Sequence, residues 1–267
     1  MKPTTGAAHA NDYDLMIIGG GIHGTTLSRL FVATGAVAPE RLAVIDPHET
    51  ACADWFRTTE ATGMRYLRSP GAHGIDGSFV SIRRFARESG YGEEHFIPPY
   101  GRPSLLLFND HLRSVVSRED LERYRLQTTA SELSLRRDSI LVETPRGGVS
   151  ANRVVLAVGS EGALNAPDVL YDVAGAVHIF DPEFDRGVLR GARRPLIVGG
   201  GISGAQAALG ALETGGAPRI ASLHPIRVSQ FDSNPCYIGP ACLTRFEAEP
   251  DPTERGRIIA SERNPGS

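Results

Sequence analysis

Cysteine, tryptophan and long apolar runs are scarce in this sequence. Its 267 residues include 3 cysteines, 1 tryptophan and 3 methionines. No run of about 18 apolar residues is present that could cross a membrane, and residues 1–12 lack an apolar core of signal-peptide length. We therefore expect a flexible terminus over residues 1–12 and a cytoplasmic protein without a membrane partner.

The cysteines also lack a pattern for redox or metal chemistry. Cys52, Cys236 and Cys242 are too few for a disulfide framework, and none belongs to a CxxC pair that could bind zinc or act as a redox dithiol. Cys236 and Cys242 could meet in space, but the expectation is two ordinary buried or half-buried thiols. Neither dithiol chemistry nor a metal site is predicted.

Neither sign of charge is in large excess. The 28 basic and 31 acidic side chains give a formal net charge of -3, so a nucleic-acid partner is not predicted. No long run of like charges indicates an interaction tail. With 41% hydrophobic and 22% charged residues, the composition is that of an ordinary globular protein, long enough for one large domain or two modest ones.

A glycine-rich turn follows the first short apolar run. Residues 15–18 predict a buried parallel strand, and Gly19, Gly21 and Gly24 follow it with GxGxxG spacing. Apolar side chains at helical intervals come next, and then a second apolar strand that ends at Asp46. The pattern therefore predicts a complete βαβ unit.

Each part of this unit has a physical role in binding a dinucleotide. Gly19 permits a tight turn, Gly21 lets the backbone approach the pyrophosphate, and Gly24 lets the helix pack against the strand. The helix N-terminus favours phosphate, and Asp46 is placed to accept hydrogen bonds from ribose hydroxyls. We predict a dinucleotide site here; a turn with only a structural role is the alternative.

The same pattern returns 180 residues later in the chain. Residues 196–198 predict a strand, and residues 205–212 predict a helix that ends before two glycines. Between strand and helix lies a second GxGxxG turn, whose predicted cofactor-binding residues are Gly199, Gly201, Ser203 and Gly204.

The strand after the second turn differs from its counterpart in the first unit. No carboxylate ends it, and His224 and Arg227 stand in that neighbourhood. A carboxylate would repel a 2′-phosphate, whereas Arg227 could pair with it. The second site is therefore predicted to prefer NADPH over NADH, with a simply solvated Arg227 as the alternative.

Between the two units lies a different pattern. Residues 124–159 contain short β-rich runs with turns at residues 137–138 and 147–148, followed by a buried strand that stops at Gly159. The predicted fold class is α/β, with two Rossmann-like dinucleotide-binding units, an antiparallel β-meander between them, and a second unit that is incomplete.

Two GxGxxG units around a β-meander and an "LAVG" strand resemble the flavoproteins with two dinucleotide-binding domains. In those proteins the first site holds FAD and the second NAD(P)H. The segments "VGGGISGAQAAL" and "SQFDSNPCYIGP" are similar to FAD-dependent N-hydroxylating monooxygenases of the lysine and ornithine type and to class B flavin monooxygenases. The resemblance implies an FAD-binding domain at 13–192, with Gly159 in its ATG-like motif, and a partial NAD(P)H-binding domain at 193–267.

The resemblance also implies where the flavin ring and the substrate lie. Trp55 and Met64 would give the ring flat apolar contact, and Arg68 and His73 would donate to its N1–C2=O edge. Asn234 falls where these enzymes carry a loop near the substrate and the nicotinamide. The structural alternatives are a surface loop over residues 55–75 and a proline-rich crossing at residues 232–240.

Two more helices are expected. Residues 101–112 predict a capped helix that packs its leucines and Phe108 inward, with His111 as a satisfied surface histidine. A short helix is expected around residues 254–263.

The implied activity is oxidation of NAD(P)H through FAD, with hydroxylation of an amine or other small nucleophile through a flavin hydroperoxide. The alternatives are an NADPH-flavin oxidoreductase without hydroxylation, and a non-catalytic nucleotide-binding subunit of a split enzyme. Only 63 residues follow Gly204, so the C-terminal part of the family pattern is missing. The expected partners are a small-molecule substrate and either a second copy of the chain, in a homo-oligomer, or a complementing chain that supplies this part.

Overall fold

The computed structural model describes residues 12–159, 164–170, 172–226, 228–229, 231, 233–238 and 240–263. The chain divides into two compact units. The first unit comprises Met1–Arg57, Gly74–Ser81 and Asn109–Ala163, and the second unit comprises Thr58–His73, Ile82–Phe108 and Leu164–Ser267. The predicted domain limits at 13–192 and 193–267 stay predictions.

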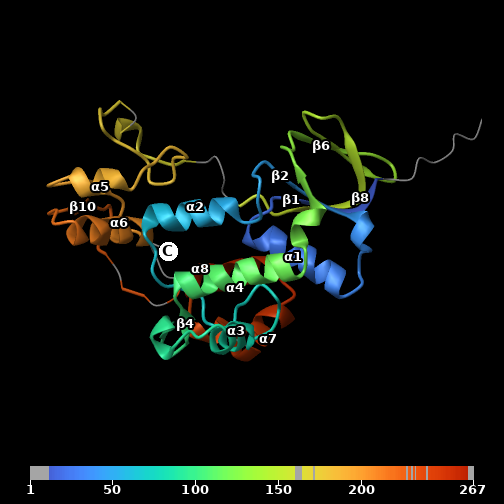
Figure 1. Cartoon of the computed structure of the whole chain (residues 1–267), viewed down its shortest axis with the longest axis horizontal. Helices are drawn as coiled ribbons and strands as arrows, with labels where there is room; N and C mark the ends of the chain where they lie inside the picture. The colour runs from blue at the N-terminus through green and yellow to red at the C-terminus, as the bar shows by residue number, and fades with distance from the viewer. Residues whose placement is uncertain are drawn as a thin grey trace, which may run out of the picture. The chain divides into compact units, whose positions relative to one another are not determined.

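Both units contain α-helices and β-strands (Figure 1). The α-helices are α1 Ile22–Ala33, α2 Ala53–Thr62, α3 Ser81–Glu88, α4 Leu105–Arg118, α5 Gly187–Gly191, α6 Ile202–Glu213, α7 Pro240–Ala248 and α8 Pro252–Glu262. The strands are β1 Tyr13–Ile18, β2 Leu42–Asp46, β3 Phe96–Ile97, β4 Arg102–Pro103, β5 Arg125–Gln127, β6 Glu132–Leu135, β7 Ile140–Glu143, β8 Val149–Leu156, β9 Leu196–Val198 and β10 Arg219–Ala221.

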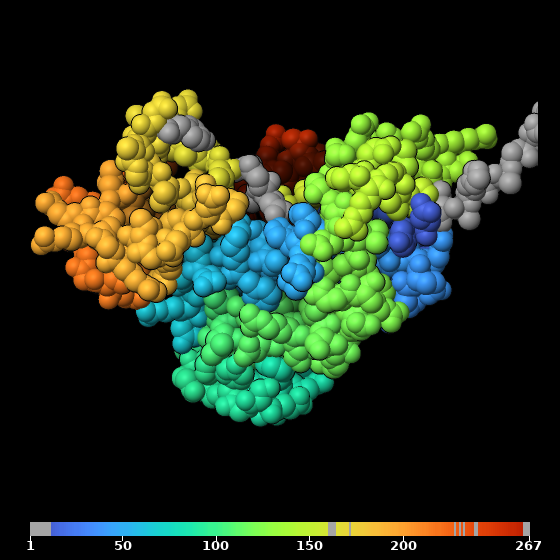
Figure 2. Space-filling view, turned by 45° about the horizontal axis from the view of Figure 1, so that its top comes forward, coloured from blue at the N-terminus to red at the C-terminus, as the bar shows by residue number. Residues whose placement is uncertain are grey.

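The main sheet lies in the first unit and has the strand order β5-β2-β1-β8-β7-β6. Strands β5, β2, β1 and β8 run parallel, while β7 pairs antiparallel with both β8 and β6. The antiparallel meander is therefore β6, β7 and β8, and β8 is also a strand of the parallel sheet. The prediction of a meander from residue 124 onward is wrong for β5, which pairs in parallel with β2 at the other edge of the sheet. Figure 2 shows the meander, green to yellow-green, beside the dark blue start of β1, where Tyr13 pairs with Ala151.

The core of the first unit forms on both faces of β1 and β2. Leu15 and Ile17 pack in one cluster, to which α1 adds Leu27 and Phe31, and Met16 contributes to a second cluster on the opposite face. All five residues of β2 are buried. Strands buried on both faces are typical of a parallel sheet, which confirms the prediction for this part of the chain.

The end of the meander is less buried than predicted. Leu156 is 62% exposed and Val158 is 51% exposed, whereas Val155 packs against the cluster that contains Leu15 and Ile17. Side chains alternate between the two faces of a strand, so Val155 and Leu156 point to opposite faces. The elements that bury Val155 therefore do not bury Leu156. The prediction of a fully buried strand ending at Gly159 is wrong for Leu156.

Helix α4 confirms the predicted helix in part: it begins at Leu105 and not at residue 101, Leu106 is exposed, and the interpretation of His111 is corrected. Leu107, Phe108 and Leu112 are buried, and Ser104 Oγ accepts a hydrogen bond of 3.2 Å from Leu107 N. His111 is buried too, with Nε2 3.8 Å from Asp76 Oδ2. Burial lowers the pKa of His111, and the Asp76 charge opposes that shift.

The second of the two predicted βαβ units consists of β9, α6 and β10 and lies within the second compact unit. Strands β9 and β10 pair in parallel with Val198 opposite Ala221, and α6 connects them. Within the described residues this sheet has two strands, and the predicted α/β fold class is confirmed. The strand predicted from residue 219 ends earlier than expected, at Ala221.

Two further findings concern the C-terminal segment. The predicted short helix is present as α8, where the Asp251 side chain accepts a hydrogen bond from Thr253 N. Cys236 and Cys242 form a disulfide, which corrects the expectation of two separate thiols. In the part of the chain that the structure describes, no helix is both long and apolar enough to cross a membrane.

Candidate dinucleotide-binding sites

The first glycine turn is closed tightly between β1, β2 and the end of β8. Gly19 has a φ of +105°, and a Cβ at this position would lie 2.3 Å from the carbonyl oxygen of Ala157. Its N–H donates to Ile45 O over 2.8 Å. A side chain is excluded by both the backbone conformation and the neighbouring strand end, as the predicted role of Gly19 requires.

Gly21 and Gly24 differ in the space available to a side chain. A Cβ on Gly24 would lie 1.8 Å from the carbonyl oxygen of Gly19, so the helix contacts the turn directly. A Cβ on Gly21 would meet nothing within 4 Å. Helix α1 starts at Ile22 and has no acidic residue in its first turn. The first N–H groups of a helix lack intrahelical partners and favour an anion, so the open side of Gly21 fits a phosphate.

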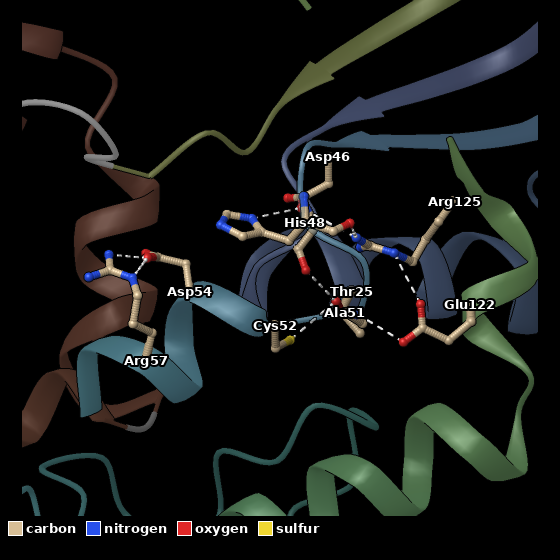
Figure 3. A network of polar contacts seen from close by, with 10 residues as sticks. Thr25, Asp46, His48, Ala51, Cys52, Asp54, Arg57, Glu122 and Arg125 are labelled. Carbon is tan, nitrogen blue, oxygen red and sulfur yellow. Dashed lines mark hydrogen bonds and ion pairs between the residues drawn. The ribbon is translucent and has the colours of Figure 1, made fainter. Parts of the chain in front are cut away.

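Asp46 holds this turn through hydrogen bonds (Figure 3). Its Oδ2 accepts a hydrogen bond of 2.5 Å from Gly20 N, and its Oδ1 accepts one of 2.9 Å from His48 N. His48 Nδ1 lies 3.0 Å and Arg125 Nη2 lies 3.3 Å from the same Oδ1. The residue is 6% exposed. The structure thus gives Asp46 a role in fixing the turn, and its contact with a ribose stays a prediction.

The charge state of Asp46 follows from these contacts. Burial alone would raise the pKa of its carboxyl group, but the N–H groups of Gly20 and His48 and the charge of Arg125 outweigh burial and lower it. Asp46 is therefore a carboxylate at neutral pH, and its negative charge holds the glycine turn through the N–H of Gly20.

Arg125 is a residue that the sequence did not reveal. Its Nη2 donates to His48 O over 2.7 Å, and its Nε lies 3.0 Å from Glu122 Oε2. The other oxygen of Glu122 accepts a hydrogen bond of 2.8 Å from Ala51 N. Figure 3 shows Arg125 between Asp46 and Glu122, so one buried cation joins two carboxylates.

The close approach of Arg125 and Asp46 to the turn requires glycine at position 20. A Cβ on Gly20 would lie 2.2 Å from Arg125 Nη1 and 3.0 Å from the Cβ of Asp46. The GxGxxG motif does not require glycine at this position. The glycine between the first two motif glycines was therefore the available signal that another side chain closely approaches the turn.

Thr25 and Cys52 hold the opposite end of the Gly20 peptide. Cys52 N donates to Gly20 O over 2.8 Å, and Thr25 Oγ1 donates to the same oxygen over 3.1 Å. The Cys52 thiol lies 3.3 Å from Thr25 Oγ1. Burial raises the pKa of Cys52 to about 11. This thiol is consequently protonated at neutral pH and serves the turn through its backbone.

The end of β8 completes the surroundings of the first turn. Beside the Ala157 contact, Val158 N lies 3.1 Å from a Cβ built on Gly19. Gly159 follows with a φ of +63° and is exposed, with nothing within 4 Å of an added Cβ. The structure therefore brings the predicted Gly159 segment to the turn formed by Gly19, while its contact with a cofactor stays a prediction.

The second glycine turn repeats the backbone of the first. Gly199 has a φ of +121° and donates to Ala221 O over 2.9 Å, and a Cβ on Gly204 would lie 2.2 Å from Gly199 O. Gly201 caps α6 with φ -79° and ψ -178°, close to the values of -71° and -167° for Gly21. Ser203, in the first turn of α6, is half-buried. The internal copy seen in the sequence is thus a copy in structure.

Ser222 occupies the position that Asp46 has in the first unit. Asp46 follows Ile45, which pairs with Ile18, and Ser222 follows Ala221, which pairs with Val198. A Cβ on Gly200 would lie 2.2 Å from Ser222 Oγ, and this hydroxyl donates to His224 O over 2.7 Å. The second turn therefore has a neutral hydroxyl where the first has a carboxylate. Arg227 lies outside the described residues.

The residues predicted to contact the flavin ring belong to different units. Trp55 lies in the part of α2 that belongs to the first unit, is half-buried, and donates from Nε1 to Asn109 Oδ1 over 2.9 Å. Met64 and Arg68 are half-buried and His73 is exposed, all in the second unit. Residues 53–62 form α2, which corrects the alternative of a surface loop from residue 55 onward.

Asn234 also lies in the second unit, where it is exposed. Its Oδ1 accepts a hydrogen bond of 3.1 Å from Cys236 N, at the start of the short 3-10 turn Pro235–Ile238. This contact is a local cap of the turn. The predicted catalytic roles of Arg68, His73 and Asn234 stay predictions.

No protein-family model and no curated protein sequence matches the chain. Solved structures do match it. OTEMO in complex with FAD and NADP has a TM-score of 0.58 at 15% identity, with 81% of this chain and 39% of that chain covered. For a flavin-containing monooxygenase from Stenotrophomonas maltophilia the TM-score is 0.57 at 19% identity, with coverages of 82% and 60%.

A third match is the bacillithiol disulfide reductase Bdr (YpdA) from Bacillus cereus, with a TM-score of 0.52 at 19% identity and coverages of 88% and 64%. The chain thus spans less than two thirds of the length of each of these three proteins. The predicted resemblance is confirmed at the level of the fold: this chain has the α/β fold of flavin monooxygenases and of a related disulfide reductase.

Proposed function

We propose that this protein is an oxidoreductase that uses FAD and NADPH, with monooxygenase-like activity on an amine or another small nucleophile. The observation that carries the proposal is the repeated turn. In both units a left-handed glycine and a helix-packed glycine surround a cap glycine at the start of a helix of 12 residues. Supporting it, OTEMO, whose fold is similar, forms a complex with FAD and NADP.

FAD is assigned to the first turn. Its pyrophosphate would lie over Gly21 at the N-terminus of α1, where a side chain is absent and the first turn of the helix carries no acidic residue. Asp46 holds the turn in the required shape through Gly20, and the Gly159 segment approaches from the β8 side. Trp55 and Met64 are proposed to contact the ring.

NADPH is assigned to the second turn, at Gly201, Ser203 and the N-terminus of α6. Ser222 supports NADPH over NADH because a neutral hydroxyl does not repel a 2′-phosphate, whereas a carboxylate in the position of Asp46 would. Arg227 is proposed as the cation that pairs with this phosphate.

Bound NADPH and FAD would supply hydride-transfer and oxygen-activation chemistry. The protein's own contribution is to orient these groups, to donate hydrogen bonds and to exclude water. Arg68 and His73 are proposed to donate hydrogen bonds to the flavin, and Asn234 to orient the substrate beside the nicotinamide.

The proposal is tested by titrating the purified protein with FAD and then with NADPH or NADH. We expect saturable FAD binding with flavin absorbance, NADPH oxidation faster than NADH oxidation, and formation of a hydroxylated product with some primary amines. Failure to take up FAD would contradict both enzymatic functions. Hydrogen peroxide as the sole product with every amine would instead favour an oxidoreductase without hydroxylation.

One observation favours a second candidate, a nucleotide-binding subunit completed by another polypeptide. Leu196 is 65% exposed and Val198 is 44% exposed on a parallel sheet of two strands, whereas parallel sheets are ordinarily covered on both faces. This candidate predicts FAD binding without NADPH oxidation by the isolated chain, and recovery of oxidation when a complementing chain or second copy is present.

A further inference from the structure

The disulfide between Cys236 and Cys242 lies apart in sequence from both glycine turns. Cys236 belongs to the 3-10 turn Pro235–Ile238, and Cys242 is the third residue of α7. Their Cα atoms are 5.3 Å apart. Both residues are half-buried, so a small reagent can reach them, whereas Cys52 is 1% exposed.

The two sulfurs of this disulfide have different surroundings. Cys242 lies in the first turn of a nine-residue helix that carries no acidic residue in that turn. A helix N-terminus stabilises negative charge, and a cysteine there favours the thiolate form. Since the more stable thiolate leaves faster in thiol–disulfide exchange, Cys242 is the better leaving group and Cys236 is the sulfur that is attacked.

We propose that Cys236 and Cys242 form an exchangeable redox disulfide that accepts electrons from low-molecular-weight thiols. This activity goes beyond the proposed FAD and NADPH chemistry and does not depend on it. A thiolate attacks Cys236 Sγ, the Cys236–Cys242 bond breaks, and Cys242 leaves as a thiolate. A second thiolate then attacks the outer sulfur of the mixed disulfide, and Cys236 is released and protonated. In total, two small thiols become one disulfide while the protein disulfide becomes two thiols.

Contacts beside the pair favour reversible opening. The rings of Tyr237 and Phe246 meet edge to face, with centroids 6.5 Å apart, and so join the 3-10 turn to α7 independently of the sulfurs. The hydrogen bond from Cys236 N to Asn234 Oδ1 holds the backbone at the attacked residue. These contacts keep the two sulfurs near each other after reduction.

The test uses the full chain under native conditions, with N-ethylmaleimide labelling read by intact mass. Without reductant we expect no label, and after incubation with reduced glutathione we expect two labels. Cys52 is the internal control, because its burial and its pKa of about 11 predict a third label only after denaturation. Two labels without reductant, or reduction that requires denaturant, would overturn the proposal.

Single variants test which sulfur leaves. In Cys236→Ser the remaining Cys242 should react with N-ethylmaleimide at pH 7 about three- to tenfold faster than Cys236 does in Cys242→Ser. Circular dichroism checks that both variants are folded, and the wild-type labelling stands on its own if either is not. Equal rates, or a faster Cys236, would contradict the assignment of Cys242 as the leaving group.

Discussion

Gly21 and Gly24 show how one residue type serves two purposes within a single turn. Gly24 is required by packing, since an added Cβ would lie 1.8 Å from the Gly19 carbonyl oxygen. Gly21 has open space around it and, on our account, is required only when a phosphate is bound. Substitutions at these two positions should therefore separate stability from ligand binding.

We expect Gly24→Ala to lower the stability of the first unit by about 1–3 kcal/mol, as overpacking does. Gly21→Ala should cost less than about 1 kcal/mol, the scale of a lost helix cap, but should weaken FAD binding. Thermal denaturation and FAD titration of both variants measure the two effects. A Gly24→Ala protein as stable as the wild type would contradict the packing at this turn.

Asp46 should make the first unit sensitive to acid. Its pKa is lowered in the folded state, so its stabilising effect is present above the ordinary value of 3.8 and is lost as the pH falls through the folded value below that. Asp46→Asn should therefore lower the melting temperature at about pH 7, and the difference from the wild type should shrink below about pH 4.

The matched control for this experiment is Asp110→Asn, which changes a more exposed carboxylate that pairs with Arg113 on the surface of α4. It should shift the melting temperature little at either pH, because exposed ion pairs contribute about 0–1 kcal/mol. A difference between wild type and Asp46→Asn that does not change with pH would contradict the account of Asp46.

Some of these residues could be predicted from the sequence and others could not. The positive φ angles of Gly19 and Gly199 and the close helix packing at Gly24 and Gly204 follow from local spacing, and the structure has them as expected. Arg125 could not be found in this way, because it reaches Asp46 from a strand 79 residues further along the chain. Contacts between distant segments depend on strand order, which local patterns do not encode. The use of Asp46 by the protein's own turn was missed for the same reason.

Among the elements, α4 illustrates a helix specified by both its cap and its apolar face. Ser104 Oγ accepts from Leu107 N and also lies 2.8 Å from His95 Nδ1. The prediction that the leucines and Phe108 pack inward holds for Leu107, Phe108 and Leu112 but not for the exposed Leu106. The burial of His111 was not predicted, because its partner Asp76 comes from a separate loop.

Ser104→Ala should destabilise the protein by about 1 kcal/mol, since it removes the oxygen that caps α4. Ser117→Ala, at an exposed position near the other end of the same helix, is the control and should be nearly neutral. Urea denaturation followed by circular dichroism gives the two values. Equal effects of both substitutions would show that Ser104 does not act as a cap.

Strands β8 and β10 show where element prediction ended. The meander was predicted from turn residues, but its first run, β5, pairs in parallel with β2, and its last strand, β8, also belongs to the parallel sheet, which sequence runs alone cannot show. Strand β10 stops at Ala221 although apolar residues continue beyond it. Apolar composition sets the tendency to form a strand, whereas pairing with a neighbour sets its length, and β9 offers only three residues.

For the whole molecule, the internal repeat carries most of the functional account. Both GxGxxG turns were recognised from sequence because their glycines meet local steric demands. The difference between their strand ends, Asp46 and Ser222, became clear only when the strand registers were compared. The disulfide also needed the structure, since a spacing of six residues does not by itself bring Cys236 and Cys242 together.

The central claim is that the first turn binds FAD and the second binds NADPH. The most direct measurement is the affinity for each nucleotide in Gly21→Glu and Gly201→Glu, because an introduced carboxylate fills the phosphate position and repels its charge. Gly21→Glu should abolish FAD retention. Gly201→Glu should retain FAD and require more NADPH for the same rate of oxidation. Equal loss of FAD from both variants would contradict the assignment of the two sites.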